Sequence, residues 1–355
     1  MSTQAIPLRT LLADNTAPAA EELVRHEPGG VVRCLACGHR CKVLPDRNGV
    51  CQVRFNRDGE LRVPFGYVAG LAVDPIEKKP FYHAYPGSRA LSFGMLGCDY
   101  HCGYCQNWVT SQSLRDDSAV AQPQFVDAER IVRLAVEHEC RVVTSTYNEP
   151  LITSEWAIEI FRLARRAGLV CSYVSNGNGT PQALEYIRPY VDLYKVDLKA
   201  FRDKTYRDLG GVLQNTLDTI RRLRQMDFWV EIVTLLVPGL NDTDAEIREL
   251  AEFVAGVSPD IPWHVTAFHP DYRMTDTDAT PVDTLLRAAQ IGRESGLRFV
   301  YPGNCHGLVG DAENTRCPNC GELLVERRGF SVRGVRIVNG ACPTCRTLIP
   351  GVWGA

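Results

Sequence analysis

The chain has 355 residues, of which 45% are hydrophobic and 23% are charged, with a net charge of −3. This composition is that of a folded globular protein, so it excludes a disordered or collagen-like chain, and the small net charge argues against a nucleic-acid partner. No apolar run reaches the roughly 18 residues that a membrane span needs, and residues 1–7 lack a secretory signal, which predicts a cytoplasmic protein with no membrane partner.

Residues 1–60 are expected to form an N-terminal segment around a four-cysteine motif. Residues 18–26 are predicted to form a short helix that ends at Gly29 and Gly30. Turn residues then accompany four thiols that are suited to one metal site: Cys34, Cys37, Cys41 and Cys51. Zinc in a closed tetrahedral site and an auxiliary iron–sulfur cluster both fit, and the sequence leaves the two open.

Residues 61–310 are expected to form one α/β domain. Short apolar runs predict strands at residues 90–96, 141–147, 169–175, 191–197, 228–236 and 262–268. Helical periods predict helices at residues 127–139, 154–167, 181–188, 213–226, 242–255 and 282–295. Six strand–helix units predict a parallel sheet in a partial (β/α)6 TIM-like barrel. A doubly wound open sheet is the alternative, because periodicity alone does not separate the two.

Residues 311–355 break this alternation and are expected to form a small C-terminal module. Two CxxC pairs separated by about 20 residues are typical of a four-thiolate zinc ribbon. The four ligands here are Cys317, Cys320, Cys342 and Cys345. A rubredoxin-like iron site is the alternative. The ribbon also carries four arginines that are expected on a solvated basic face: Arg327, Arg328, Arg333 and Arg336.

Three of the 14 cysteines lie outside the clusters. Cys140 and Cys171 are next to or within predicted strands, which favours buried small hydrophobes. Cys305 lies in a glycine-rich loop near the expected barrel mouth. Because the chain is large and lacks an export signal, its clustered cysteines favour metal chemistry over disulfides.

The central motif, Cys98-x3-Cys102-x2-Cys105, follows directly on the first predicted barrel strand. Loops after the strands form the functional face of β/α barrels. Three thiolates can hold a [4Fe–4S] cluster with one iron left open, and an open iron can bind a substrate or cofactor. A zinc knuckle with a distant fourth ligand is the alternative.

This motif in this place resembles that of the radical S-adenosylmethionine (SAM) superfamily. The resemblance implies a catalytic [4Fe–4S] cluster on these three cysteines, SAM as cofactor, and an external one-electron reductant of the flavodoxin or ferredoxin type. It further implies that cleavage of SAM gives a 5′-deoxyadenosyl radical, which abstracts hydrogen from a substrate. Residues that match the family's SAM-contacting positions are Tyr104, Glu149, Asn176, Asp197, Lys199 and His269. The chain departs from the pattern at Tyr147 and Asn148, where the family has a glycine pair.

Further motifs are similar to those of the AmmeMemoRadiSam radical SAM family: residues 71–80, 105–108, 146–150, 237–242 and 268–272. That family is related to pyruvate formate-lyase activating enzymes, which act on a glycine of a partner enzyme. The resemblance therefore implies an oxidoreductase that acts on an unidentified substrate, with a partner protein and Memo-like or AMMECR-like proteins as candidate partners. The alternatives are a non-catalytic iron–sulfur or zinc scaffold, an electron carrier, or a radical SAM methyltransferase.

Overall fold

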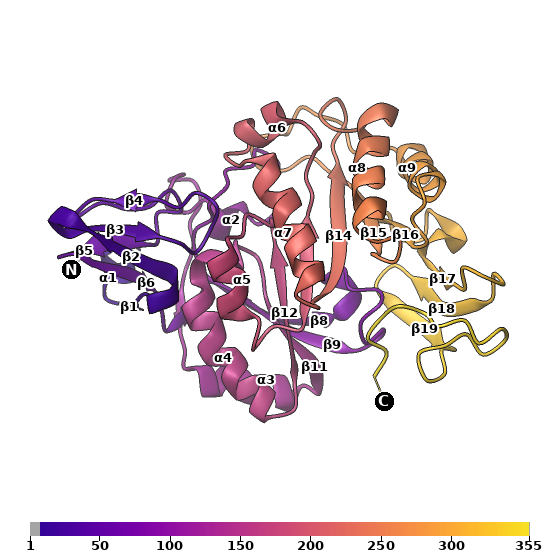
Figure 1. The fold of residues 1–355 in the computed structure, drawn as a ribbon, viewed down its shortest axis with the longest axis horizontal. Coiled ribbons are helices and arrows are strands. Elements are labelled where there is room, and N and C mark those ends of the chain that lie inside the picture. Colours follow the sequence, from indigo (N-terminus) through magenta and orange to yellow (C-terminus); the bar gives the residue numbers. More distant parts are fainter. Residues whose placement is uncertain (1–7, 355) are drawn as a thin grey trace, which may run out of the picture.

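The computed structural model describes residues 8–354, so residues 1–7, to which the expectation of no secretory signal applies, lie outside the described part. At its centre is an eight-stranded sheet with the order β16-β15-β14-β13-β12-β11-β9-β8 (Figure 1). The strands are β8 (Gly70–Pro75), β9 (Arg89–Gly94), β11 (Cys140–Ser145), β12 (Val170–Ser175), β13 (Leu193–Asp197), β14 (Trp229–Leu236), β15 (Trp263–Ala267) and β16 (Val300–Gly303). Only β8 runs antiparallel to its neighbour.

The strand order decides between the two predicted architectures. From β9 to β16 each strand pairs with the next in sequence, without the reversal that defines a doubly wound sheet. The edge strands β8 and β16 do not pair with each other in the described part of the chain, so the sheet is open. The structure is therefore an α/β partial barrel, with one parallel strand, β16, more than the sequence predicts.

All six predicted barrel helices are present and differ from their expected bounds by a few residues at most. They are α3 (Ala128–Glu137), α4 (Ser154–Arg166), α5 (Pro181–Ile187), α7 (Leu213–Gln225), α8 (Asp244–Val257) and α9 (Val282–Glu294). Side-chain oxygens cap the N-termini of several of these helices. Asp127 accepts a hydrogen bond from the backbone N–H of Arg130 at 2.6 Å, and Thr243 caps α8 in the same way.

The remaining helical segments are short. They are α1 (Leu8–Ala13), α2 (Trp108–Ser111), α6 (Asp203–Asp208) and the 3₁₀ turns η1 (Glu21–Leu23), η2 (Pro28–Gly30), η3 (Ile76–Lys78), η4 (Pro150–Thr153) and η5 (Gly310–Glu313). Among residues 8–354, no helix is both long and apolar enough to cross a bilayer.

The N-terminal segment consists of two small antiparallel sheets. One holds β1 (Thr16–Pro18), β6 (Glu60–Pro64) and β5 (Phe55–Arg57), and the other holds β2 (Val24–Glu27), β3 (Val31–Cys34) and β4 (Lys42–Val43). The helix predicted at residues 18–26 is wrong. Val24 pairs with Cys34 in a strand ladder, and only η1 is helical there. Nine residues are too few for a helix to hold without tertiary support, so the sheet prevails.

The C-terminal module is a three-stranded sheet of β17 (Thr315–Arg316), β18 (Leu323–Arg328) and β19 (Ser331–Val335). Its core packs against Tyr82, Phe299 and Tyr301 of the barrel, and the chain then returns to pair Val352 with Ala84. A short ladder of β7 (Tyr67–Val68) with β10 (Gln124–Phe125) completes the strands.

One expected feature of this module is wrong. Arg327 is buried and donates to the Tyr82 carbonyl at 2.6 Å, whereas Arg328, Arg333 and Arg336 are exposed. The basic face therefore has three arginines rather than four, because Arg327 ties the module to the barrel.

Candidate functional site

A cavity of about 380 Å³ lies at the C-terminal ends of the barrel strands. Cys98, Cys102 and Cys105 line it from the loop between β9 and α2. Five of the six predicted SAM-contacting residues line the same cavity, although they come from four different segments: Tyr104, Glu149, Asn176, Asp197 and Lys199. The sequential parallel strands bring these segments to one face, as expected for a β/α barrel.

The cysteine loop leaves β9 through a tight turn at Gly97. Its φ is +88°, and a Cβ at this position would lie 2.7 Å from Val53 and 2.9 Å from the Cys51 carbonyl. Only glycine combines that backbone conformation with such close packing. The turn thereby sets the position of Cys98 against the N-terminal segment.

The chemistry of the three thiols fits an iron–sulfur cluster. No fourth cysteine is among the described residues that line the cavity, which matches a three-thiolate cluster with one open iron. Burial raises the pKa of Cys98 and Cys105, and raises that of Cys102 to about 12. The Lys199 ammonium opposes this rise at Cys102 and Cys105. Metal binding must therefore displace protons from these thiols.

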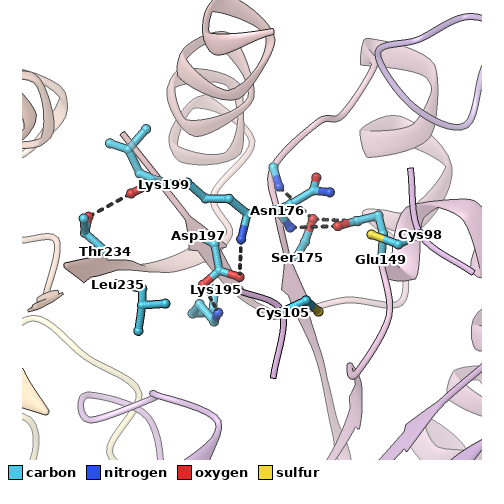
Figure 2. A network of polar contacts seen from close by, with 12 residues as sticks. Cys98, Cys105, Glu149, Ser175, Asn176, Lys195, Asp197, Lys199, Thr234 and Leu235 are labelled. Carbon is cyan, nitrogen blue, oxygen red and sulfur yellow. Dashed lines mark hydrogen bonds and ion pairs between the residues drawn. The ribbon is translucent and has the colours of Figure 1, made fainter. Parts of the chain in front are cut away.

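Glu149 is held by three donors, of which Figure 2 shows Ser175 and Asn176. Its carboxylate accepts hydrogen bonds from the Ser175 hydroxyl at 2.7 Å and from the Asn176 and Leu151 backbone N–H groups at 2.7 and 3.1 Å. Burial, followed by the nearby Asp99 charge, raises the pKa of Glu149 to about 8. Glu149 thus both caps η4 and lines the cavity, so its structural and ligand-facing roles coexist.

Asn176 is expected to contact SAM, but its side chain is hydrogen-bonded to other residues of the protein. Its side-chain amide donates to Asp99 Oδ1 at 2.7 Å, and its Oδ1 accepts from the Asn178 N–H at 2.9 Å. The side chain therefore links the cysteine loop to the loop after β12. Asp99, which the sequence analysis did not single out, is fully buried at this junction.

A second polar group lies across the cavity on β13 (Figure 2). Asp197 pairs with Lys195, and its other oxygen lies 3.5 Å from Lys199 Nζ. Both lysines lower the pKa of Asp197 against the effect of burial. Lys195 points into the barrel from the middle of a strand, which is a position where sequence patterning predicts an apolar residue; no motif identified it.

His269 lies apart from these residues. Its imidazole is exposed and contacts Gln106 Nε2 at 2.9 Å, and it is not among the residues that line the cavity. His264 is buried in β15, and its Nε2 lies 2.7 Å from Glu231 Oε2. Tyr104 is buried within the cavity wall.

The flanking cysteines differ in their arrangement. The ligand atoms of Cys317, Cys320, Cys342 and Cys345 all lie within 4.8 Å of one another, which is a ready metal site. Burial, with a smaller contribution from the nearby Cys34, raises the pKa of Cys37, Cys41 and Cys51. Within residues 8–354, the ligand atoms of these four cysteines do not all lie within 4.8 Å of one another.

The three isolated cysteines are all buried. Burial raises the pKa of Cys305 to about 11, and this thiol does not line the cavity although its neighbour Asn304 does. Burial also raises the pKa of Cys140 and Cys171, as expected for small core residues.

Comparison with known proteins agrees with this geometry. The Radical SAM superfamily model matches residues 94–254. The uncharacterized protein MJ0808 of Methanocaldococcus jannaschii is 35% identical over 322 residues, which cover 90% of this chain and 94% of that protein. The pyruvate formate-lyase-activating enzyme of Staphylococcus aureus strain USA300 is 27% identical over 225 residues, covering 58% of this chain and 88% of the enzyme.

Among solved structures, a radical SAM methyltransferase from Sphaerobacter thermophilus superposes with a TM-score of 0.48 and 18% identity, covering 90% of this chain and 86% of that one. The family model and the sequence relatives carry the assignment. Residues 94–254 therefore form a domain of the radical SAM superfamily, and the chain is homologous to the pyruvate formate-lyase-activating enzymes.

Proposed function

We propose that the protein binds a [4Fe–4S] cluster through Cys98, Cys102 and Cys105, and SAM through Tyr104, Glu149, Asn176, Asp197, Lys199 and His269. The bound cluster and SAM would together supply a 5′-deoxyadenosyl radical that abstracts hydrogen from a substrate. The observation that carries this proposal is the cavity itself, which one buried and two half-buried thiols share with a carboxylate and a lysine.

The residues around the cavity divide the work of holding SAM. Glu149 is an acceptor for the amino group of SAM, and Lys199 is a donor for its carboxylate. Asp197 holds Lys199 in place at 3.5 Å. Asn176 contributes by fixing the loop after β12 rather than by offering a free side chain. His269 would need to turn from Gln106 toward the cavity to reach a ligand.

We propose that the substrate is a partner polypeptide and that the enzyme is an activase-like oxidoreductase. Support comes from relatives named as activating enzymes of isethionate sulfite-lyase and pyruvate formate-lyase. A flavodoxin- or ferredoxin-type protein would deliver the electron. The motifs at residues 71–80 and 268–272 support a place in the AmmeMemoRadiSam system, with Memo-like or AMMECR-like partners.

We propose zinc for the C-terminal four-thiol site, because four sulfur ligands within 4.8 Å of one another suit the tetrahedral coordination of structural zinc. The N-terminal thiols would bind either zinc or an iron–sulfur cluster, and metal binding would draw them together. On this proposal residues 1–60, 61–310 and 311–355 form an N-terminal metal segment, the barrel and a C-terminal metal module.

The test is anaerobic reconstitution with iron and sulfide, followed by reductant and SAM. We expect 5′-deoxyadenosine and methionine from the native protein and from Cys140→Ala, which changes a buried cysteine outside the site. Cys98→Ala should form neither product. SAM binding is measured in parallel, because a missing partner can suppress turnover. The proposal fails if the native protein neither binds nor cleaves SAM, and S-adenosylhomocysteine as the product would indicate a methyltransferase instead.

A further inference from the structure

Five residues that have no role in holding the cluster or SAM line another part of the same cavity: Lys78, Lys79, Pro80, Tyr147 and Phe330. They come from the segment after β8, the end of β11 and the turn between β18 and β19. Because these segments lie on different parts of the chain, the fold has brought two lysines and two aromatic rings together beside the radical site.

Lys79 is a buried cation that is paired with Asp74. Its side chain is 4% exposed, and its Nζ lies 2.8 Å from Asp74 Oδ2. The other oxygen of Asp74 already accepts from Lys78 at 2.8 Å, and Lys78 is 50% exposed. Two lysines thus share one carboxylate, which leaves one positive charge over. Because Lys78 is half exposed, water solvates part of this charge, and an anion in the cavity would balance the rest.

The cysteines do not supply that anion. Burial lowers the pKa of Lys79 and Asp74 opposes that change, whereas Asp197 and Cys102 raise the pKa of Lys199 against the effect of burial. Lys199 therefore serves the thiol end of the cavity, and Lys79 faces a different region of it.

Tyr147 is positioned beside Lys79 by a strained backbone. Its φ is +70°, in the left-handed region that costs a non-glycine residue free energy. A Cβ at Gly94 would lie 2.8 Å from the Tyr147 Cβ, and one at Gly70 would lie 3.0 Å from its ring. The ring packs under Lys79 Nζ at 4.9 Å from its centroid, with the phenol oxygen 3.4 Å from Nζ. Two glycines thus make room for one oriented phenol.

We propose that Lys79 and Tyr147 bind an anionic group of the substrate, a carboxylate or a phosphate, and so orient the substrate in the cavity. The inference rests on the proposed function only in taking this cavity as the place where the substrate lies. The Lys79 ammonium and the Tyr147 hydroxyl would both donate to the anion, and charge-assisted hydrogen bonds of this kind are about twice as strong as neutral ones. Asp74 fixes the position of the Lys79 ammonium.

The experiment is a calorimetric titration of the reconstituted protein with sodium acetate and with inorganic phosphate, each with and without saturating SAM. We expect one of the two anions to bind the SAM-loaded native protein, and the anion that binds identifies the class. Lys79→Met should weaken binding about tenfold or more, which corresponds to about 1.4 kcal/mol. Lys78→Met removes the same charge from the exposed lysine and should change binding by less than about threefold.

A thermal melt of each variant reports whether it is folded. If Lys79→Met does not fold, Tyr147→Phe replaces it, since this change removes one donor without altering charge and should also weaken anion binding. The inference is overturned if neither anion binds, if Lys79→Met and Lys78→Met behave alike, or if saturating SAM abolishes anion binding. Formation of 5′-deoxyadenosine by the native protein tests the proposed function separately, so its absence would leave a demonstrated anion site standing.

Discussion

The carboxylate of Asp99, one residue after Cys98, accepts a hydrogen bond from the side-chain amide of Asn176 at 2.7 Å. Its second oxygen accepts from Asn178 at 2.9 Å, so this buried carboxylate joins the cysteine loop to the loop after β12. The link joins the loops that follow β9 and β12, which β11 separates in the sheet, and it bears directly on where Cys98 lies.

We predict that Asp99→Ala lowers the free energy of unfolding by about 1–3 kcal/mol, because two buried amides lose their acceptor. The looser loop should also retain less iron after reconstitution. Asp99→Asn keeps one of the two acceptor oxygens, so its stability and iron content should lie between those of Asp99→Ala and the native protein. Chemical denaturation and iron analysis measure both effects, with the exposed Asp117→Ala as control. Equal stability and iron content in Asp99→Ala and the control would contradict the role of this link.

A second prediction concerns Arg327. Its guanidinium donates to Thr315 Oγ1 and the Tyr82 carbonyl, lies over the Tyr82 ring at 4.3 Å, and comes within 3.9 Å of the buried Glu77. Removing one partner of a buried ion pair typically costs about 3–5 kcal/mol. Arg327→Met should therefore destabilise the protein by that order and expose the C-terminal module to limited proteolysis. Arg328→Met, at an exposed site next in the chain, should do neither.

A third prediction is a pH dependence that originates at His83. Burial lowers the pKa of His83 to about 4, while its two ring nitrogens contact the Pro350 carbonyl at 2.7 Å and the Tyr301 hydroxyl at 2.6 Å. An unfolded histidine takes up a proton near pH 6.5, so the unfolded state binds more protons between about pH 4 and 6.5. Stability contributed by neutral His83 is complete above that window and falls as the pH drops through it.

Unfolding at a series of pH values measures this contribution as the difference between two proteins. His83→Asn should reduce the loss of stability between about pH 6.5 and 4, by up to about 1.4 kcal/mol per pH unit. The exposed His138→Asn should follow the native protein. If the His83→Asn and native curves stay parallel, His83 is not the source.

A fourth prediction concerns the C-terminal thiols. The sulfur atoms of Cys317 and Cys345 lie 3.5 Å apart, and those of Cys320 and Cys342 lie 3.6 Å apart. Because metal binding free energy is also folding free energy, Cys342→Ser should lose one equivalent of metal and melt at a lower temperature. Elemental analysis identifies the metal, and Cys171→Ser is the control. Unchanged metal content in Cys342→Ser would exclude the site.

The strand–helix alternation was predictable because each element is long enough to display its own period. Gly70–Pro75 and Val300–Gly303 escaped that reasoning. The strand Gly70–Pro75 lies at the edge of the sheet, and its residues were assigned to a sequence motif. The strand Val300–Gly303 has four residues, one of them proline, and is too short to show the alternation of apolar and polar residues that identifies a strand. Short elements of this kind take their conformation from the neighbour that they pair with.

Those residues of the candidate site that belong to a sequence motif were predictable. Glu149 and Lys199 follow strands in recognisable patterns, so the barrel topology was enough to bring them together. The pairs Asp99–Asn176 and Lys79–Tyr147 depend on side-chain contacts across 77 and 68 residues of chain, for which no local pattern exists. The burial of Arg327 escaped for the same reason, since its partner Tyr82 lies 245 residues away.

The return of the chain to His83 has a consequence for the order of events during synthesis. The His83 carbonyl and its imidazole receive their partners from Val352 and Pro350, and the Tyr82 carbonyl receives its partner from Arg327. A ribosome makes all three of these partners after the last barrel strand. The hydrogen-bonding groups of Tyr82 and His83 must therefore wait, without these partners, until the C-terminal module emerges from the ribosome.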